Sequence, residues 1–123
     1  MAKAETKIVH KIIEHLEEKF FGIYLRKIHG NPFQHAGIPD IIGCYKKFFI
    51  ALEVKTDTGK TSLIQQLEGS IILEAEGIYG VVRTKEQALS VIKTALGERH
   101  ETELHTRPGD ASKVVEMEQR TRS

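Results

Sequence analysis

The spacing of apolar residues along the chain predicts three helices. In residues 3–20 they recur at helical spacing among charged residues, and residues 85–96 repeat this amphipathic pattern up to Gly97. A third helix is expected up to about residue 76, where Thr61 or Ser62 caps its start and Gly77 ends it. Each predicted helix has one apolar side with which to cover a sheet.

Shorter apolar segments predict four strands, at 23–28, 40–44, 48–55 and 78–84. Residues 29–37 contain Gly and Pro and are expected to form a loop. Tyr24 and Cys44 lie within these strands and are expected to be buried. The order helix, three strands, helix, strand, helix predicts an α/β fold with a mixed sheet flanked by helices.

Composition limits the organisation of the chain. Its 123 residues fit one domain, expected over residues 1–97, and the polar segment 98–123 is expected to be a mobile tail with a helical turn near 114–117. Its one cysteine, Cys44, cannot form an intramolecular disulfide, which fits a cytoplasmic location. No apolar segment is long enough to span a membrane, so no membrane partner is expected. The net charge of +1 indicates neither nucleic acid nor another partner.

Charged residues interrupt the two central strands. Glu53 and Lys55 point to the same side of one strand, because side chains alternate along a strand. If the two strands form a hairpin that turns between Lys46 and Lys47, residues whose numbers sum to 93 face each other. Asp40 then lies opposite Glu53, with Cβ atoms roughly 5 Å apart. Lys-Lys is unfavourable in a two-residue turn, so a looser loop with the same centre is expected.

Two facing carboxylates repel each other unless they share a proton or bind a cation. Carboxylate oxygens suit Mg²⁺ or Mn²⁺, and the Val54 carbonyl offers a further oxygen. Lys55 beside such a cation can stabilise charge on a phosphate, which is the arrangement for metal-assisted phosphodiester hydrolysis. Each residue alone has a structural explanation, as a turn aspartate or an exposed ion pair. Their facing positions favour chemistry.

Pro39-Asp40 followed by Glu53-Val54-Lys55 resembles the motif of the PD-(D/E)XK nuclease superfamily. The segments "GIPDII", "ALEVKTDTGKTSLIQQ" and "LEAEGIYGVVRT" are similar to the VRR-NUC family, which occurs alone in phages and fused within eukaryotic repair nucleases. The resemblance covers residues 5 to about 95 and implies a restriction-endonuclease-like fold.

The resemblance also implies roles for individual residues. Asp40, Glu53 and the Val54 carbonyl would bind the metal, and Lys55 would be the catalytic lysine. Glu5, on the first helix, is the residue that best matches a further family glutamate. A family glutamine matches Gln65 or Gln66, and Gln66 is preferred because it lies nearer the apolar stripe of its helix, which is expected to face the sheet.

Basic residues near the motif are candidates for DNA binding. Lys46, Lys47 and Lys60 lie in the turns around it. Arg83 matches a basic position of the family and is expected either to contact phosphate or to pair with a carboxylate. The six histidines show no spacing typical of a zinc site, so no metal role is assigned to them.

The resemblance implies a metal-dependent endonuclease that acts on branched DNA in repair and recombination. Its most specific form is a homodimeric Holliday-junction resolvase, because a two-fold dimer matches the symmetry of a four-way junction. The alternatives are a nuclease for flap, nicked or replicating DNA, and a non-catalytic DNA-binding module.

Overall fold

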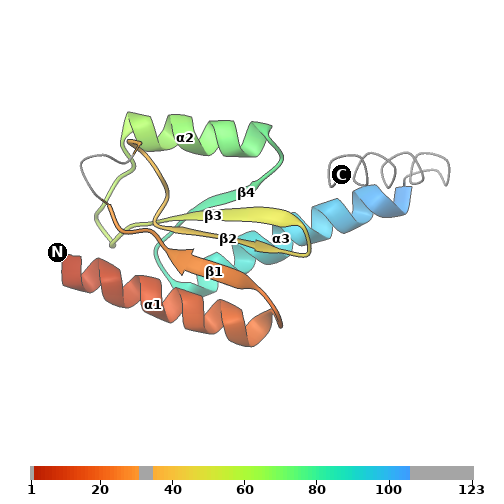
Figure 1. Ribbon diagram of the computed structural model, residues 1–123, viewed down its shortest axis with the longest axis horizontal. Helices are drawn as coiled ribbons and strands as arrows, with labels where there is room; N and C mark the ends of the chain where they lie inside the picture. The colour runs from red at the N-terminus through yellow and green to blue at the C-terminus, as the bar shows by residue number, and fades with distance from the viewer. Residues whose placement is uncertain (1, 31–34, 106–123) are drawn as a thin grey trace. The chain divides into compact units, whose positions relative to one another are not determined.

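The computed structural model describes residues 2–30 and 35–105 and has the predicted order of elements (Figure 1). They are α1 (Ala2–Lys19), β1 (Tyr24–Lys27), β2 (Ile41–Tyr45), β3 (Phe48–Val54), α2 (Leu63–Glu74), β4 (Ile78–Val82) and α3 (Lys85–His105). The chain divides into two compact units, Met1–Ile92 and Lys93–Ser123. The sheet, α1 and α2 belong to the first unit.

The four strands form one mixed sheet in the order β1-β2-β3-β4. The pairs β1–β2 and β2–β3 are antiparallel, and β3–β4 is parallel. The predicted α/β class with a mixed sheet is therefore confirmed.

The β2–β3 hairpin has the predicted register. Ile41 pairs with Leu52 and Tyr45 with Phe48, so the numbers of facing residues sum to 93. The expected looser loop was wrong. Lys46 and Lys47 form a tight two-residue turn with φ angles of 48° and 70°, as in a type I′ turn, whose twist matches that of the flanking strands.

The two faces of the sheet are covered unequally. On one face the strands pack against α1 and the start of α3, and Figure 1 shows α2 on the opposite side of the sheet from α1. The buried apolar side chains in this core come from α1, all four strands and α3: Val9, Ile12, Leu16, Leu25, Ile41, Ile50, Leu52, Val54, Ile78, Val82, Ala88 and Ile92. On the other face α2 packs chiefly over β4.

Tyr24 and Cys44 lie on this second face and are exposed, so their predicted burial was wrong. The two residues face each other across β1 and β2, which lie beyond the strand that α2 covers. The alternation of apolar and polar residues shows which side chains share a face of a strand. It does not show how much of the second face of the sheet a single helix covers.

Helix α2 is capped at both ends by local hydrogen bonds. Ser62 is its N-cap and forms a reciprocal capping box with Gln65. At its other end, Glu76 takes the left-handed conformation with φ of 67°, and the next amide, of Gly77, donates to the Ile72 carbonyl at 2.8 Å. The C-cap is Ala75 and the left-handed residue is Glu76, so the expected cap at Gly77 was wrong. Gly77 is needed for space instead, since a Cβ there would lie 2.7 Å from Ile72 Cγ2.

Helix α3 continues through Gly97 to His105, so its predicted end at Gly97 was wrong. Gly97 does not have the positive φ that would end the helix. A glycine inside a helix costs only about 1 kcal/mol relative to alanine, so the helix continues through it. The division into 1–97 and 98–123 stays a prediction, and the rest of the predicted tail, 106–123, lies outside the described residues. None of the described helices is long and apolar enough to cross a membrane.

Candidate active site

The site lies where β2 begins and β3 ends. Asp40 precedes β2, and its Oδ2 accepts a hydrogen bond of 2.7 Å from the Val54 amide on β3. Its carbonyl accepts another of 2.8 Å from Ile28, at the end of β1. The register of the hairpin places Glu53 opposite Asp40, as predicted. The backbone of β1 and β3 therefore holds the Asp40 carboxylate beside Glu53.

Glu53 is a buried carboxyl group. Its side chain is 2% exposed, and it is the buried charged residue of the described core. Burial, the neighbouring Asp40 carboxyl and, more weakly, Glu5 raise its pKa from 4.5 to about 9, while Lys55 acts in the opposite direction. Such a group is neutral at pH 7 unless a cation compensates its charge.

The two oxygens of Glu53 have different environments. Oε1 accepts a hydrogen bond of 3.1 Å from the Gln65 amide, whereas Oε2 is buried and accepts no hydrogen bond from the described residues. The neighbouring Asp40 carboxyl can satisfy Glu53 only if the two carboxyls share a proton, and this hydrogen bond contributes to the raised pKa of Glu53. A buried acceptor without a partner costs about 1–3 kcal/mol. A proton on this oxygen or a bound cation would remove that cost.

Gln65, rather than the preferred Gln66, contacts the site. Gln65 bonds Glu53 through its amide nitrogen and the Ser62 amide through Oε1, whereas Gln66 bonds Thr61 on the exposed side. The preference for Gln66 was wrong because the apolar stripe of α2 faces away from the sheet. The side of α2 that packs on the sheet is therefore opposite to the side that the apolar stripe predicts.

If the site cleaves DNA, as the sequence resemblance implies, this difference between neighbouring glutamines predicts different effects on the cleavage rate. Gln65→Ala is expected to reduce the DNA-cleavage rate about tenfold, because Glu53 loses the donor that orients it. Gln66→Ala, one residue away on the same helix, is expected to leave the rate within about twofold. Single-turnover cleavage at saturating Mg²⁺ measures both, and equal effects would contradict the assignment.

Lys55 and Glu5 complete the charged groups of the site. Lys55 follows β3, lies on the same side as Glu53 and is close enough to lower its pKa. Its amide donates to the Val82 carbonyl at 3.0 Å, which fixes its backbone against the end of β4. Glu5, in the first turn of α1, is close enough to raise the pKa of Glu53. The four ionisable residues predicted for the site, Glu5, Asp40, Glu53 and Lys55, therefore lie together.

Tyr79 is a member of the site that the sequence analysis missed. Its hydroxyl is buried without a hydrogen-bond partner, and its pKa is raised by burial, by Glu53 and by Asp40. Its ring lies against α2 at Gly69, where a Cβ would be 2.3 Å from Tyr79 Cε2. The pairing of Tyr79 with Ala51 places it on the Glu53 side of the sheet. Only the parallel register of β3 and β4 reveals this position.

A comparison with solved structures bears on this geometry. A structure described as "VRR_NUC domain" matches with a TM-score of 0.54 and 20% sequence identity, covering 73% of this chain and 95% of that chain. This chain has the VRR_NUC fold. No protein-family model matches the sequence, and no curated protein matches it significantly.

Two carboxylates, those of Asp40 and Glu53, decide whether the site can hold a metal ion. No group of three or more His, Cys, Asp or Glu side chains arranged to hold a metal ion occurs in the described part of the chain. Mg²⁺ is nonetheless commonly held by one or two carboxylates together with waters and substrate phosphates. Asp40 and Glu53 provide such a pair, and the buried Glu53 Oε2 lacks a partner. These residues fit a divalent cation that completes its shell with water and substrate.

The basic residues predicted to bind DNA lie in three different places. Lys46 and Lys47 form the hairpin turn at the far end of β2 and β3, roughly 20 Å from Asp40 at about 3.3 Å per residue. Lys60 is exposed in the loop before α2. Arg83 donates to the Thr56 carbonyl and so connects the segments that follow β3 and β4. Lys60 and Arg83 thus flank the site end of the sheet, and the hairpin lysines do not.

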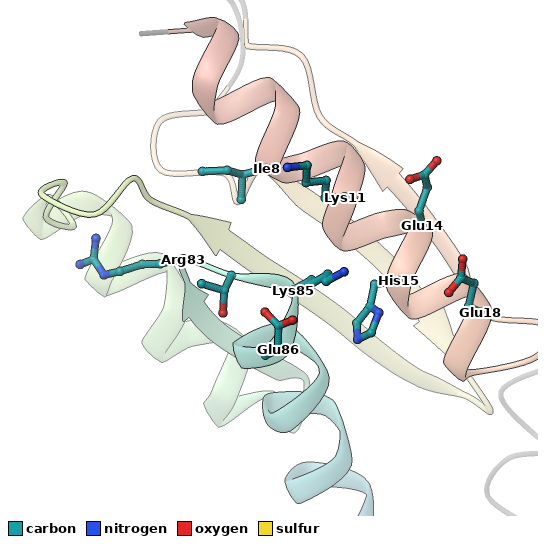
Figure 2. A pocket seen from close by; sticks show the side chains of 9 residues that line it. Ile8, Lys11, Glu14, His15, Glu18, Arg83, Lys85 and Glu86 are labelled. Carbon is teal, nitrogen blue, oxygen red and sulfur yellow. The ribbon is translucent and has the colours of Figure 1, made fainter.

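Two pockets lie near these elements. One, of about 340 Å³, is lined by Asp40 and the preceding segment, and His35 in that segment pairs with Glu68 of α2 at 3.4 Å. The other, of about 430 Å³, lies between α1 and the start of α3 (Figure 2). Its charged lining is mixed: Lys11, Glu14, His15, Glu18, Arg83, Lys85 and Glu86. Only the first pocket adjoins the carboxylate pair, and the second lacks the single sign of charge expected of a phosphate site.

Proposed function

We propose that this protein is a divalent-metal-dependent endonuclease that hydrolyses phosphodiester bonds in branched DNA. The observation that carries the proposal is the pair of buried polar atoms without partners, Glu53 Oε2 and the Tyr79 hydroxyl. Among the described residues, these are the two buried side-chain polar atoms that lack a hydrogen bond. Native proteins pair most such atoms. The Asp40 and Glu53 carboxyls can satisfy each other only by sharing a proton, and a bound cation would take the place of that proton.

Asp40, Glu53 and the Val54 carbonyl would hold the cation, Mg²⁺ or Mn²⁺. When bound, it supplies Lewis acidity toward the phosphate. The Val54 amide orients Asp40, and Gln65 orients Glu53, so neither carboxylate has to reorganise on binding. Glu5 adds negative charge at the same end of the sheet.

Lys55 is the residue that acts on the reacting phosphate. Its ammonium would neutralise charge that develops on the non-bridging oxygens and orient the attacking water. Its position beside Glu53 on the same side of the sheet supports this role. Lys60 and Arg83, near the site, would contact phosphates along the DNA backbone.

The preferred substrate is a four-way DNA junction, cut by a homodimer. A two-fold dimer presents two equivalent sites to two symmetric strands. The VRR_NUC likeness supports the nuclease fold, and the choice of a junction is our extension of it. We place the activity in the cytoplasm and in repair and recombination, as for the stand-alone phage domains that the sequence resembles.

A panel of labelled substrates tests the choice of DNA. Purified protein with Mg²⁺ or Mn²⁺ is expected to cut a four-way junction at paired symmetric positions, and to cut a flap, a nicked duplex, an intact duplex and a single strand at least about tenfold more slowly. Preferred cutting of flaps or nicks would support the alternative repair or replication nuclease. Tight binding without cleavage of any substrate would support a DNA-binding module.

A further inference from the structure

Helix α2 packs on the sheet with its more polar side. Gln65 bonds Glu53, and Gly69 is buried against Tyr79. Both residues lie roughly 160° around the helix from Leu67, at 3.6 residues per turn. The side of α2 that faces the sheet therefore carries Gln65 and Gly69. The opposite side of the helix, around Leu67, is uncovered.

The uncovered side is an apolar stripe. It consists of four large side chains, which are exposed as follows: Leu63 70%, Ile64 52%, Leu67 55% and Ile71 63%. We call them the α2 stripe. Amphipathic helices normally bury such a stripe, and monomeric proteins rarely expose contiguous apolar patches larger than a few hundred Å². This orientation leaves the stripe available to a partner.

The charge of α2 excludes two classes of partner. Its sequence, LIQQLEGSIILE, contains two glutamates and no lysine or arginine. A DNA-binding surface requires basic residues to neutralise phosphates. A helix that lies on a membrane typically has basic residues along its polar side. The α2 stripe thus fits an apolar protein surface.

The stripe is complementary to itself when two copies run antiparallel. With a two-fold axis at Leu67, residues whose numbers sum to 134 meet, so Leu63 packs against the partner's Ile71. One axis therefore matches apolar residues with apolar residues, as a self-complementary two-fold interface requires.

We propose that the α2 stripe is the surface on which a second copy of this chain docks, with the two α2 helices antiparallel about Leu67. Stable interfaces bury roughly 800 Å² per partner, so the stripe forms the apolar centre of a larger contact. Gln65 is near the start of each 12-residue helix, which is about 18 Å long. Antiparallel pairing thus places the two active sites at opposite ends of the helix pair.

This inference rests on the homodimer of the proposed function and assigns its interface. The exposure of the stripe does not depend on nuclease activity. Sedimentation velocity of the whole chain over a range of concentrations tests it. The wild type is expected to be a dimer. Leu67→Glu is expected to weaken dimerisation roughly a hundredfold, because like charges meet at the axis.

Leu73→Glu is the matched control. Leu73 is 55% exposed, like Leu67, but lies roughly 120° around the helix from it, away from the stripe. It is expected to remain dimeric, and circular dichroism verifies that both variants fold.

Several outcomes would overturn the proposal: a monomeric wild type at every concentration, a dimeric and folded Leu67→Glu, or equal effects of Leu67→Glu and Leu73→Glu. Metal-dependent plasmid nicking, measured on the same preparations, separates this failure from that of the nuclease. A nicking monomer refutes the interface and the homodimer but leaves the nuclease standing, and an inactive dimer refutes the nuclease alone.

Discussion

Lys55→Met is expected to reduce the single-turnover rate of DNA cleavage by roughly 10²–10³-fold, the typical loss when one group that stabilises transition-state charge is removed. The lysine is beside Glu53 at the end of β3, where it lowers the pKa of that carboxyl. Methionine keeps much of the length of the side chain and removes its charge. DNA affinity is expected to change by less than about threefold, since the contacts along the DNA backbone remain.

Lys60→Met is the control for charge alone. Lys60 is exposed in the loop before α2. As a contact to phosphates of the DNA backbone, it should affect the affinity for DNA more than the cleavage rate at saturating DNA. Single-turnover rates and dissociation constants measured side by side separate the two effects. If Lys55→Met weakened binding but left the saturated rate unchanged, Lys55 would be a contact residue and the assigned role would be wrong.

The metal-free protein is expected to lose stability as the pH rises from 5 to 9. The pKa of Glu53 is raised from 4.5 to about 9 in the folded protein, chiefly by burial and then by Asp40. Between these values the folded state retains a proton that the unfolded state has released, so the stabilising contribution is present at low pH and is lost as the pH rises through this range. The slope for one proton is about 1.4 kcal/mol per pH unit.

Urea unfolding in the presence of a chelator, at a series of pH values, measures this slope. Glu53→Gln is expected to remove most of it, because glutamine has a similar shape and does not ionise. Saturating Mg²⁺ should stabilise the wild type more at pH 8 than at pH 6, since the cation competes with the proton. A pH-independent free energy of unfolding in the wild type, or an unchanged slope in Glu53→Gln, would contradict a neutral buried Glu53.

Local rules were sufficient to predict the centre of the site. The facing of Asp40 and Glu53 follows from the hairpin register, which the apolar pattern and the turn between Lys46 and Lys47 determine together. Lys55 follows from alternation along the same strand. The type of turn was predicted incorrectly because the twist of the strands outweighed the poor preference of lysine for positive φ.

Residues positioned by tertiary packing could not be predicted in the same way. Gln65 reaches Glu53 because α2 directs its apolar stripe outward, contrary to the usual rule for an amphipathic helix. Tyr79 joins the site through a parallel register that no hairpin determines. Tyr24 and Cys44 are exposed because a single helix covers only part of the second face.

The arrangement of the two carboxylates limits the chemistry of the site. Asp40 is held by backbone amides, and Glu53 is buried with one oxygen unpaired. A purely structural pair of carboxylates would be expected to have both oxygens satisfied by the protein. This pair can share a proton, as the raised pKa of Glu53 indicates, or bind a cation in place of that proton.

Nicking of supercoiled plasmid tests the central claim most directly. Wild-type protein is compared with Glu53→Gln, each with Mn²⁺ and with a chelator, after circular dichroism has shown that both proteins fold. We predict nicking only by the wild type and only with the cation. Nicking by Glu53→Gln at the wild-type rate, or by the wild type in the chelator, would contradict a metal-dependent nuclease centred on Asp40 and Glu53.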